Sequence, residues 1–264
     1  MQKEIVRRVM EVIQKEGVRE IFEDWIIHWF GLELKPEGIP RYDDFIKSVK
    51  KGEQVSLSDY VDMLIGFDFR SGIKGIESLR KLEDEPILLL ANHHKGPIGG
   101  GWKNVLINYY VKQATGKEIR WLHGFDPTAR QDLFREKLHN SINSIPVRDP
   151  GPQRAAKLFI QVIREKDSMG LYPEGDGSKN LRKALPEAGR LIAFCVRNGM
   201  HIVSCATRYQ NNTFFLTFDT LDSKDIETSG EEGSDRYAKR QNTADYAMRN
   251  IAKHLPVNRR GYYK

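Results

Sequence analysis

The sequence predicts an α/β protein in which helices flank a mixed, largely parallel sheet and a helical region precedes the sheet at the N-terminus. From about residue 67 onward, short apolar runs of strand length alternate with longer segments of helical period. Before that point the apolar residues recur only at helical spacing. The 264 residues, of which 39% are hydrophobic, suffice for one substantial core and a small accessory region. We therefore expect a helical region over residues 1–66 and an α/β domain over residues 67–264.

Helices are expected throughout the N-terminal region. Apolar residues recur at helical spacing over 1–16 and 18–30, and glycines and prolines separate these segments from two further helices over 42–50 and 58–65. The segment 18–30 is rich in aromatic residues. A basic helix of this kind either lies in the interface of a bilayer or packs its aromatic face against the domain, and the pattern leaves both open. Peripheral contact with a membrane is thus one of two interpretations.

The α/β domain is expected to alternate strands and helices. Strands are predicted over residues 67–75, 86–91, 119–124, 144–147, 169–172, 201–207 and 213–218. Helices are predicted over residues 102–115, 126–140, 153–165, 186–198 and 237–254. The last two strands form an antiparallel hairpin if they pair across the polar turn 210–212. The acidic segment 223–234, which contains glycine and serine, is expected to be a mobile loop.

Charge and hydropathy narrow the range of partners. The formal net charge of +6 favours acidic partners such as nucleic acid, an anionic lipid surface or a phosphate-bearing small substrate. No zinc-ligand spacing, RNA-recognition signature or stripe of aromatic and basic residues accompanies this charge, so we expect no nucleic-acid partner. The longest apolar runs fall far short of the ~20 residues that a membrane span needs. We therefore expect no membrane-spanning helix.

The cysteines and the N-terminus indicate the compartment. Cys195 and Cys205 both lie in apolar segments, which is typical of buried thiols in a reducing compartment. The N-terminus lacks the apolar core and cleavage site of a signal peptide. We expect a cytoplasmic protein, associated with a membrane if the segment 18–30 binds a bilayer.

The main candidate for chemistry is a histidine at the end of an apolar run. Residues 86–91 are predicted to form a buried strand, and Asn92 and His93 follow it directly, before a glycine-rich turn that begins at His94. Imidazole is the side chain best suited to take a proton near neutral pH, and α/β folds place their chemistry at strand ends. His93 is therefore a candidate general base, although the spacing alone does not separate it from His94. The alternative is a structural histidine, hydrogen-bonded in a tight turn.

Three further blocks lie at predicted strand ends or in adjoining loops: Ile145-Pro146-Val147-Arg148, Tyr172-Pro173-Glu174-Gly175 and Ile202-Val203-Ser204-Cys205. The guanidinium of Arg148 suits a phosphate or carboxylate better than a lysine would. The glycines that follow Glu174 let backbone N–H groups approach a carbonyl or phosphate closely. The basic residues that can enlarge an anion-binding rim are Lys95, Lys179 and Arg182. The structural alternatives are a surface salt bridge for Arg148, an acidic turn at Glu174 and solvated side chains on the rim.

In this order and spacing, the four blocks resemble the glycerolipid acyltransferase family, of the lysophosphatidic-acid acyltransferase type. That family carries an Asn-His-x4-Asp block, an Ile-Pro/Phe-Val/Ile-x-Arg block, a Phe-Pro-Glu-Gly block and an apolar strand. The resemblance extends over about residues 73–207. It implies transfer of a fatty acyl group from acyl-CoA or acyl carrier protein to the hydroxyl of a lysophospholipid or related glycerolipid, with no metal and no further cofactor. It also implies that His93 is the general base. The residues expected to bind substrate are Asn92, Lys95, Arg148, Glu174 and Gly175.

The sequence departs from the family pattern at the carboxylate that would orient the histidine. The position five residues after His93 holds Ile98, and no acidic residue occurs between His93 and Glu118. In a serine protease triad, replacing the orienting Asp by Asn costs about 10⁴ in kcat. Three explanations remain open: a carboxylate from elsewhere, with Asp126 and Glu174 the nearest by block, a backbone carbonyl that holds the ring, or a site that binds ligand without turnover. The last would make the chain a lipid- or acyl-chain-binding protein that retains the acyltransferase fold.

Overall fold

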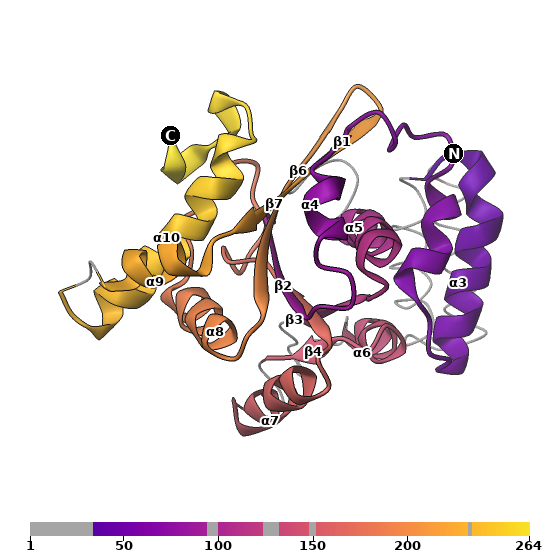
Figure 1. Cartoon of the computed structure of the whole chain (residues 1–264). Coiled ribbons are helices and arrows are strands. Elements are labelled where there is room, and N and C mark those ends of the chain that lie inside the picture. The colour runs from indigo at the N-terminus through magenta and orange to yellow at the C-terminus, as the bar shows by residue number, and fades with distance from the viewer. Residues whose placement is uncertain (1–33, 94–99, 124–131, 148–151, 232–233) are drawn as a thin grey trace.

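The computed structural model describes residues 34–93, 100–123, 132–147, 152–231 and 234–264 (Figure 1). The helices expected over 1–16 and 18–30 lie outside the described residues. The described part has helices on both faces of one sheet, which confirms the α/β class.

The described residues form one seven-stranded sheet in the order β1-β7-β6-β2-β5-β3-β4. Its strands are β1 (Ile73–Lys74), β2 (Ile87–Ala91), β3 (Ile119–His123), β4 (Ile145–Pro146), β5 (Ser168–Leu171), β6 (His201–Gln210) and β7 (Thr213–Leu221). Strands β2 to β6 run parallel, whereas β7 is antiparallel to β6 and β1 is parallel to β7. The sheet is therefore mixed and largely parallel, as predicted. The predicted hairpin is also present, because Asn211 and Asn212 both take the positive φ that a two-residue turn of type I′ requires.

The helices alternate with these strands along the chain. They are α3 (Ile39–Lys51), α4 (Ile76–Arg80), α5 (Gly100–Thr115), α6 (Asp132–Ser141), α7 (Pro152–Arg164), α8 (Pro186–Arg197), α9 (Ser223–Glu231) and α10 (Arg236–Lys253). Short 3-10 helices are η1 (Pro36–Gly38), η2 (Leu57–Leu64), η3 (Val257–Arg259) and η4 (Gly261–Tyr263). The helix expected over 58–65 is thus the 3-10 helix η2, and the strand expected over 67–75 is reduced to β1.

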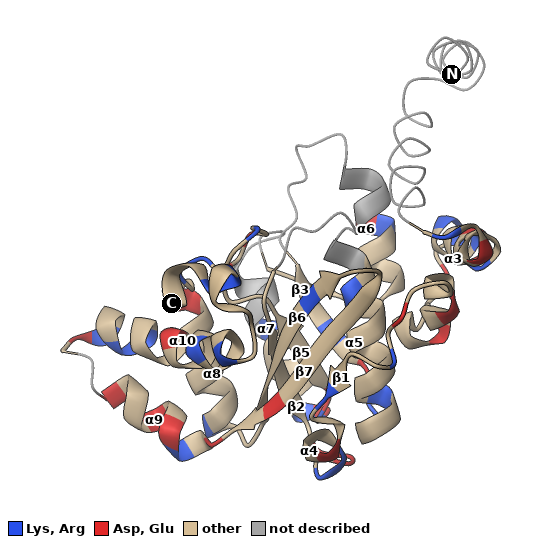
Figure 2. Ribbon diagram, turned by 90° about the horizontal axis from the view of Figure 1, so that it is seen from above, with Lys and Arg blue, Asp and Glu red and all other residues tan. Residues whose placement is uncertain are grey.

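The segment 223–234, expected as a mobile loop, contains α9 instead. Ile226 is only 1% exposed and packs in the core with α8 and α10. The Asp222 carboxylate accepts the amide N–H of Lys224 at 2.7 Å, where the helix begins. The acidic residues of α9 are coloured red on the ribbon in Figure 2. The loop prediction was wrong because one apolar anchor suffices to fix a short acidic helix against a formed core.

Side chains of β2 alternate between two apolar cores, one on each face of the sheet. Ile87, Leu89 and Ala91 belong to the core beneath α3, α4 and α5, and Leu88 and Leu90 to the core beneath α7, α8 and α10. Figure 1 shows α3 to α6 on one side of the sheet and α8 to α10 on the other. All five side chains are fully buried, and each leucine or isoleucine contributes about 1.5–3 kcal/mol. This strand is therefore firmly held between the two cores and fixes the position of the residues that follow it.

The described part of the predicted N-terminal region, residues 34–66, shares the first of these cores with the sheet. Tyr42 and Phe45 on α3 and Met63 on η2 pack in the same cluster as Leu89 on β2. The domain boundary expected at residue 66 stays a prediction, but residues 34–66 are packed as one body with the strands.

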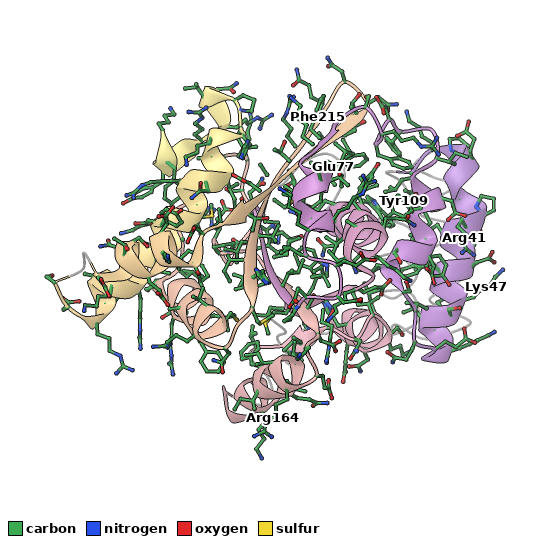
Figure 3. All side chains as sticks on the ribbon, viewed as in Figure 1. Arg41, Lys47, Glu77, Tyr109, Arg164 and Phe215 are labelled. Atoms are coloured by element: carbon green, nitrogen blue, oxygen red, sulfur yellow. The ribbon has the colours of Figure 1, made fainter. Side chains whose placement is uncertain are left out.

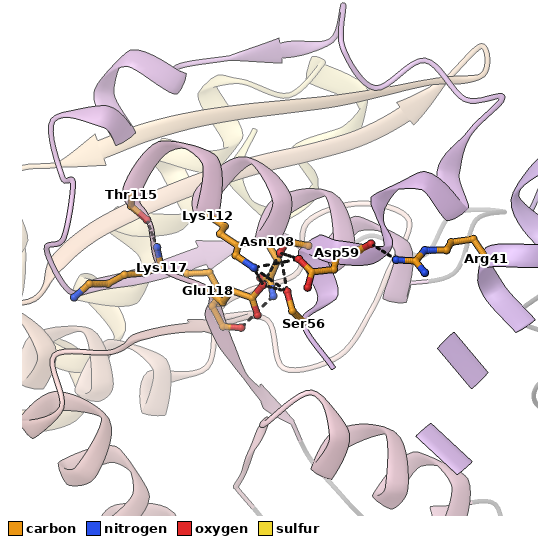
Figure 4. A network of polar contacts seen from close by, with 10 residues as sticks. Arg41, Ser56, Asp59, Asn108, Lys112, Thr115, Lys117 and Glu118 are labelled. Carbon is orange, nitrogen blue, oxygen red and sulfur yellow. Dashed lines mark hydrogen bonds and ion pairs between the residues drawn. The ribbon is translucent and has the colours of Figure 1, made fainter. Parts of the chain in front are cut away.

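A polar network also joins this region to the sheet (Figure 4). The ammonium of Lys112 on α5 lies 3.2 Å from carboxylate oxygens of both Asp59 on η2 and Glu118, which precedes β3. Glu118 in turn accepts hydrogen bonds from the hydroxyls of Ser56 and Ser58. Because the ion pairs are partly exposed, salt and water screen them, and each contributes about 1 kcal/mol or less.

Charged side chains cover the outer faces of the helices. Lys47 on α3 and Arg164 on α7 are exposed and point away from the sheet (Figure 3). Among the described residues, no helix combines the length and the apolar character that crossing a membrane requires.

The connections between strands favour a ligand site at one edge of the sheet. Strand β2 is followed by α5, which packs on the first core, whereas its neighbour β5 is followed by α8, which packs on the second. Adjacent parallel strands whose connections go to opposite faces leave a crevice beyond their carboxyl ends, and α/β proteins bind ligands there. In this protein that point lies where His93 follows β2 and Tyr172 follows β5.

Gly189 sets the distance between α8 and α10, and we predict that Gly189→Ala destabilises the protein. A Cβ at this position would collide with the backbone carbonyl of Arg240 and approach the backbone nitrogen of Ala244 to 3.0 Å. Backbone atoms cannot rotate aside, so we expect the free energy of unfolding in urea to fall by about 1–3 kcal/mol. Arg190→Ala, on the exposed face of the same helix, is the control and should change it by less than about 0.5 kcal/mol. Equal urea midpoints of unfolding for the two variants would contradict the close packing of α8 against α10 at Gly189.

Candidate active site

His93 and Glu174 come together at the carboxyl edge of the sheet from different strands. His93 lies two residues beyond the end of β2, and Glu174 lies three residues beyond the end of β5. The two strands are neighbours in the sheet, so their loops leave it side by side. The amide N–H of His93 donates a hydrogen bond to Glu174 Oε2 at 2.7 Å. The histidine block and the Glu-Gly block of the sequence therefore meet directly.

A pocket of about 490 Å³ lies beside these two residues. Its walls come from the loop after β5, the end of β6 and the segment that follows α10. Besides His93 and Glu174, the lining includes Lys179, Arg208 and Arg259. The three cationic side chains outnumber the one carboxylate, and this excess favours an anionic ligand.

The segment after α10 is fixed against the loop that follows β5. Arg259 Nη1 donates to the carbonyl of Lys179 at 3.1 Å. The amide of Leu181 donates to the carbonyl of Arg259 at 3.1 Å, and the amide of Tyr262 donates to the carbonyl of Leu181 at 3.0 Å. These bonds fix η3 and η4 against the loop after β5, so Arg259 is held in the wall of the pocket.

Asn92 joins the end of β2 to β6. Its Oδ1 accepts the amide N–H of Thr207 at 2.6 Å, and its Nδ2 donates to the carbonyl of Thr207 at 3.0 Å. Asn92 is only 3% exposed, so both bonds are shielded from water. The structure thus gives Asn92 a role in positioning His93. The contact with substrate that we expected of it stays a prediction.

The peptide group between Asn92 and His93 is bonded at both ends by buried charged side chains. Its carbonyl accepts a hydrogen bond from Lys103 Nζ at 3.1 Å, and its amide donates to Glu174 at 2.7 Å. Lys103 is 7% exposed and Glu174 is 5% exposed. One peptide group therefore lies between an ammonium group and a carboxylate group.

Lys103 lies near the N-terminal end of α5, with its ammonium 4.3 Å from the centroid of the Tyr172 ring. Burial lowers the pKa of Lys103 to about 7, although the Glu174 carboxylate and the Cys205 thiol act in the opposite direction. A lysine with this pKa exchanges its proton near neutral pH, which is unusual for the residue type.

Lys103 was not among the residues predicted from the sequence, although a signal for it exists. Leu106 and Ile107, three and four positions further along α5, are fully buried. A helical lysine three and four residues before buried apolar residues lies on the inward face of the helix. Lysines are seldom found there unless a partner holds the charge.

Glu174 is held by backbone amides on two sides, and Gly175 then turns the chain. Besides the bond from His93, Glu174 Oε1 accepts the amide N–H of Arg182 at 2.8 Å. Burial raises the pKa of Glu174, and the bonds from these two amides limit the rise. Gly175 has φ of 74°, a left-handed conformation that favours glycine, and its amide donates to the carbonyl of Tyr172 at 2.9 Å. Both carboxylate oxygens of Glu174 thus accept main-chain amides, one of them the amide of His93, and a bond from Glu174 to the imidazole stays a prediction.

The imidazole of His93 packs against aromatic rings. It meets Tyr172 edge-on with ring centroids 4.5 Å apart, and Tyr172 stacks on Trp121 at 5.0 Å. The Tyr172 hydroxyl donates to Asn104 on α5, and burial raises the pKa of Tyr172 well above its usual value. Tyr172 is therefore neutral, and the rings give the imidazole an apolar wall on one side.

Several residues predicted from the sequence lie outside the described part of the chain: Lys95, Arg148 and Asp126, together with His94 and Ile98. The anion contacts expected of Arg148 and Lys95 stay predictions. The pocket contains two cations that sequence analysis did not identify, Arg208 and Arg259. Arg208 directly follows the region of resemblance and Arg259 lies well beyond it, so no sequence block pointed to either.

We predict that Asn92→Ala destabilises the protein, because the amide and carbonyl of Thr207 lose their buried partners. Leaving such groups unsatisfied costs about 1–3 kcal/mol each, and the free energy of unfolding in urea measures the loss. Asn198→Ala is the control, since the Asn198 side chain bonds a carbonyl at an exposed position. A loss for Asn92→Ala no greater than for this control would show that the junction between β2 and β6 does not depend on Asn92.

No model of a known protein family matches this chain, and no curated protein matches it either. The acyltransferase interpretation therefore rests on the four sequence blocks and on the positions of their residues. The geometry brings the histidine block and the Glu-Gly block together at the carboxyl edge of the sheet, beside a pocket with an excess of cations.

Proposed function

We propose that the protein is an acyltransferase that moves a fatty acyl group from acyl-CoA or acyl carrier protein to the hydroxyl of a lysophospholipid or related glycerolipid. The observation that supports this most is the position of His93, beyond the central strand and in the lining of the cationic pocket. Its amide is bonded to Glu174, and its carbonyl accepts the amide N–H of Ser178 at 2.9 Å. A histidine with a fixed main chain beside an anion-binding pocket suits a base that acts on a phosphate-bearing alcohol.

In the proposed reaction, the imidazole of His93 takes the proton of the acceptor hydroxyl while the hydroxyl oxygen attacks the thioester carbonyl. A C–O bond forms and the C–S bond breaks. The leaving thiolate takes the proton from the imidazolium, so the products are an acylated acceptor and a free thiol. The rings of Tyr172 and Trp121 exclude water from one side of the imidazole, which favours transfer to the acceptor over hydrolysis.

The pocket suits the phosphate end of such an acceptor. Its volume of about 490 Å³ is ordinary for a small-molecule site. Arg208 and Arg259 each use Nη1 in a hydrogen bond within the protein and have further N–H donors that suit a phosphate, and Lys179 adds a third charge. Because lysophospholipids partition into bilayers, the proposal includes contact between the protein and a membrane surface.

A second candidate function is a lipid- or acyl-chain-binding protein that retains this fold without turnover. It is favoured by Ile98, which occupies the position of the motif carboxylate. The two candidates share the pocket and differ in their need for the imidazole of His93.

We predict that the protein releases free thiol from acyl-CoA when lysophosphatidate is present, and that His93→Ala lowers turnover by about 10²–10⁴-fold. A colorimetric thiol assay measures the release. His201→Ala is the matched control, since His201 is exposed and lies at the opposite edge of the sheet, level with Ile87 at the start of β2. It should leave turnover unchanged.

Absence of thiol release above the His93→Ala background, with acyl-CoA and acyl carrier protein as donors and several lysophospholipid acceptors, would overturn the enzymatic proposal. Saturable binding of acyl chains under those conditions would support the second candidate.

We predict that Arg259→Gln raises KM for lysophosphatidate about tenfold and leaves kcat nearly unchanged. One hydrogen bond to a charged group contributes about 1.5–3 kcal/mol, and 1.4 kcal/mol corresponds to a factor of ten. Steady-state kinetics measure the change. Arg249→Gln removes the same charge from an exposed position on α10 and should have little effect. Equal KM values for the two variants would show that the pocket does not hold the phosphate.

A further inference from the structure

Two oppositely charged side chains are buried on either side of the His93 peptide. Lys103 Nζ bonds its carbonyl at 3.1 Å, and Glu174 Oε2 bonds its amide at 2.7 Å. Burying a charge costs much free energy unless hydrogen bonds and an opposite charge compensate it. Here the compensation passes through a single peptide group, which the ammonium and the carboxylate polarise in the same direction.

The location of Lys103 is unfavourable for a cation. The residue is 7% exposed, and it lies near the N-terminal end of α5, where the helix dipole also disfavours positive charge. A methionine of similar length would fill the space without losing hydration. The groups that favour the ammonium are the carbonyl of Asn92, the face of the Tyr172 ring and the carboxylate of Glu174. The presence of a lysine here is therefore best explained by the hydrogen bond from its ammonium to the carbonyl of Asn92.

We propose that Lys103 is a positioning residue, and that the bridge from Lys103 through the Asn92–His93 peptide to Glu174 fixes His93 in the absence of the motif carboxylate. The catalytic consequence rests on the proposed function, whereas the bridge itself does not. Hydrogen bonds at both ends of the Asn92–His93 peptide hold its plane in one orientation. The imidazole then stays against Tyr172, at the edge of the pocket.

The bridge makes the site sensitive to pH near neutrality. The pKa of Lys103 is about 7, because burial outweighs the effect of Glu174 and Cys205. The other titratable groups close to this ammonium are Tyr172, whose pKa burial raises, and His93 beyond the Tyr172 ring. As pH rises above 7, Lys103 loses its charge and the bridge weakens.

The effect of Lys103 on stability has the opposite sign to its effect on activity. Its pKa in the folded protein lies below the ordinary lysine value of 10.5. Between pH 7 and 10.5 the unfolded chain therefore binds more protons at this residue than the folded protein does. Its contribution to the free energy of unfolding rises with pH across this window, while the bridge loses its charge.

Nuclear magnetic resonance of the whole wild-type protein tests the bridge without any assay. Side-chain signals of Lys103 should titrate near pH 7, and the backbone amide signal of His93 should follow the same titration. The amide of Val162, which is buried on α7 in the other core, should show no such step. A Lys103 that titrates with the exposed lysines, or a His93 amide that ignores its titration, would overturn the proposal.

Kinetics of two variants test the consequence. In the wild type, kcat should fall above about pH 7, and Lys103→Arg, which stays charged, should retain activity and move this fall to higher pH. Lys103→Met should lower kcat about 10²-fold with little change in KM, since misplacing a base by about 1 Å has effects of this size. Lys112→Met, which removes an ion-paired lysine from the other end of α5, is the control and should keep the wild-type pH profile.

The positioning role would be overturned if kcat of Lys103→Arg fell at the same pH as in the wild type. A Lys103→Met variant with wild-type kcat would overturn it as well. If Lys103→Met does not fold, the resonance titration of the wild type and the pH profile of Lys103→Arg still test the positioning role. If no acceptor gives thiol release, the proposed function fails, and the resonance titration still decides whether the bridge exists.

Discussion

The hydrogen bonds to the Asn92–His93 peptide are the interactions on which the rest of the site depends. They connect three parts of the protein that are distant in sequence: β2, the loop after β5 and the first turns of α5. The side chain of Asn92 adds β6 to this set through Thr207. The main chain of His93 is thus tied to the sheet, to a helix and to a loop. Burying Lys103 and Glu174 lowers stability in exchange for a fixed geometry, a compromise common at functional sites.

The path of the backbone alone creates the location of this site. Neighbouring parallel strands β2 and β5 send their helices to opposite faces, so the loops that follow them border one crevice. The apolar residues of β2 face both cores and hold the strand that carries His93. The C-terminal segment then closes one wall of the pocket and brings Arg259 to it. Residues distant in the sequence, His93 and Arg259, therefore meet at one edge of the sheet.

Apolar patterning was enough to predict most of the elements, because α3, α7 and α8 are strongly amphipathic and β2 is a short continuous apolar run. It missed α9, whose single anchor, Ile226, gives no periodic signal. Strand-end positions correctly brought the segments of His93 and Glu174 together. The bonding of Glu174 to a backbone amide depends on the path of a loop, which residue spacing does not encode. Lys103 was overlooked because most helical lysines are solvated, and only the buried residues around it show otherwise.

We propose that the imidazole of His93 contacts the acceptor, in a pocket that binds its phosphate. The most direct measurement is a titration of protein labelled with ¹³C at its histidine rings, using a short-chain lysophosphatidate that does not form micelles. We expect the ring signals of His93 to shift in a saturable way while those of His201 do not, and free phosphate to compete for the effect. A titration that leaves the His93 signals unmoved, or that moves the signals of both histidines equally, would contradict it.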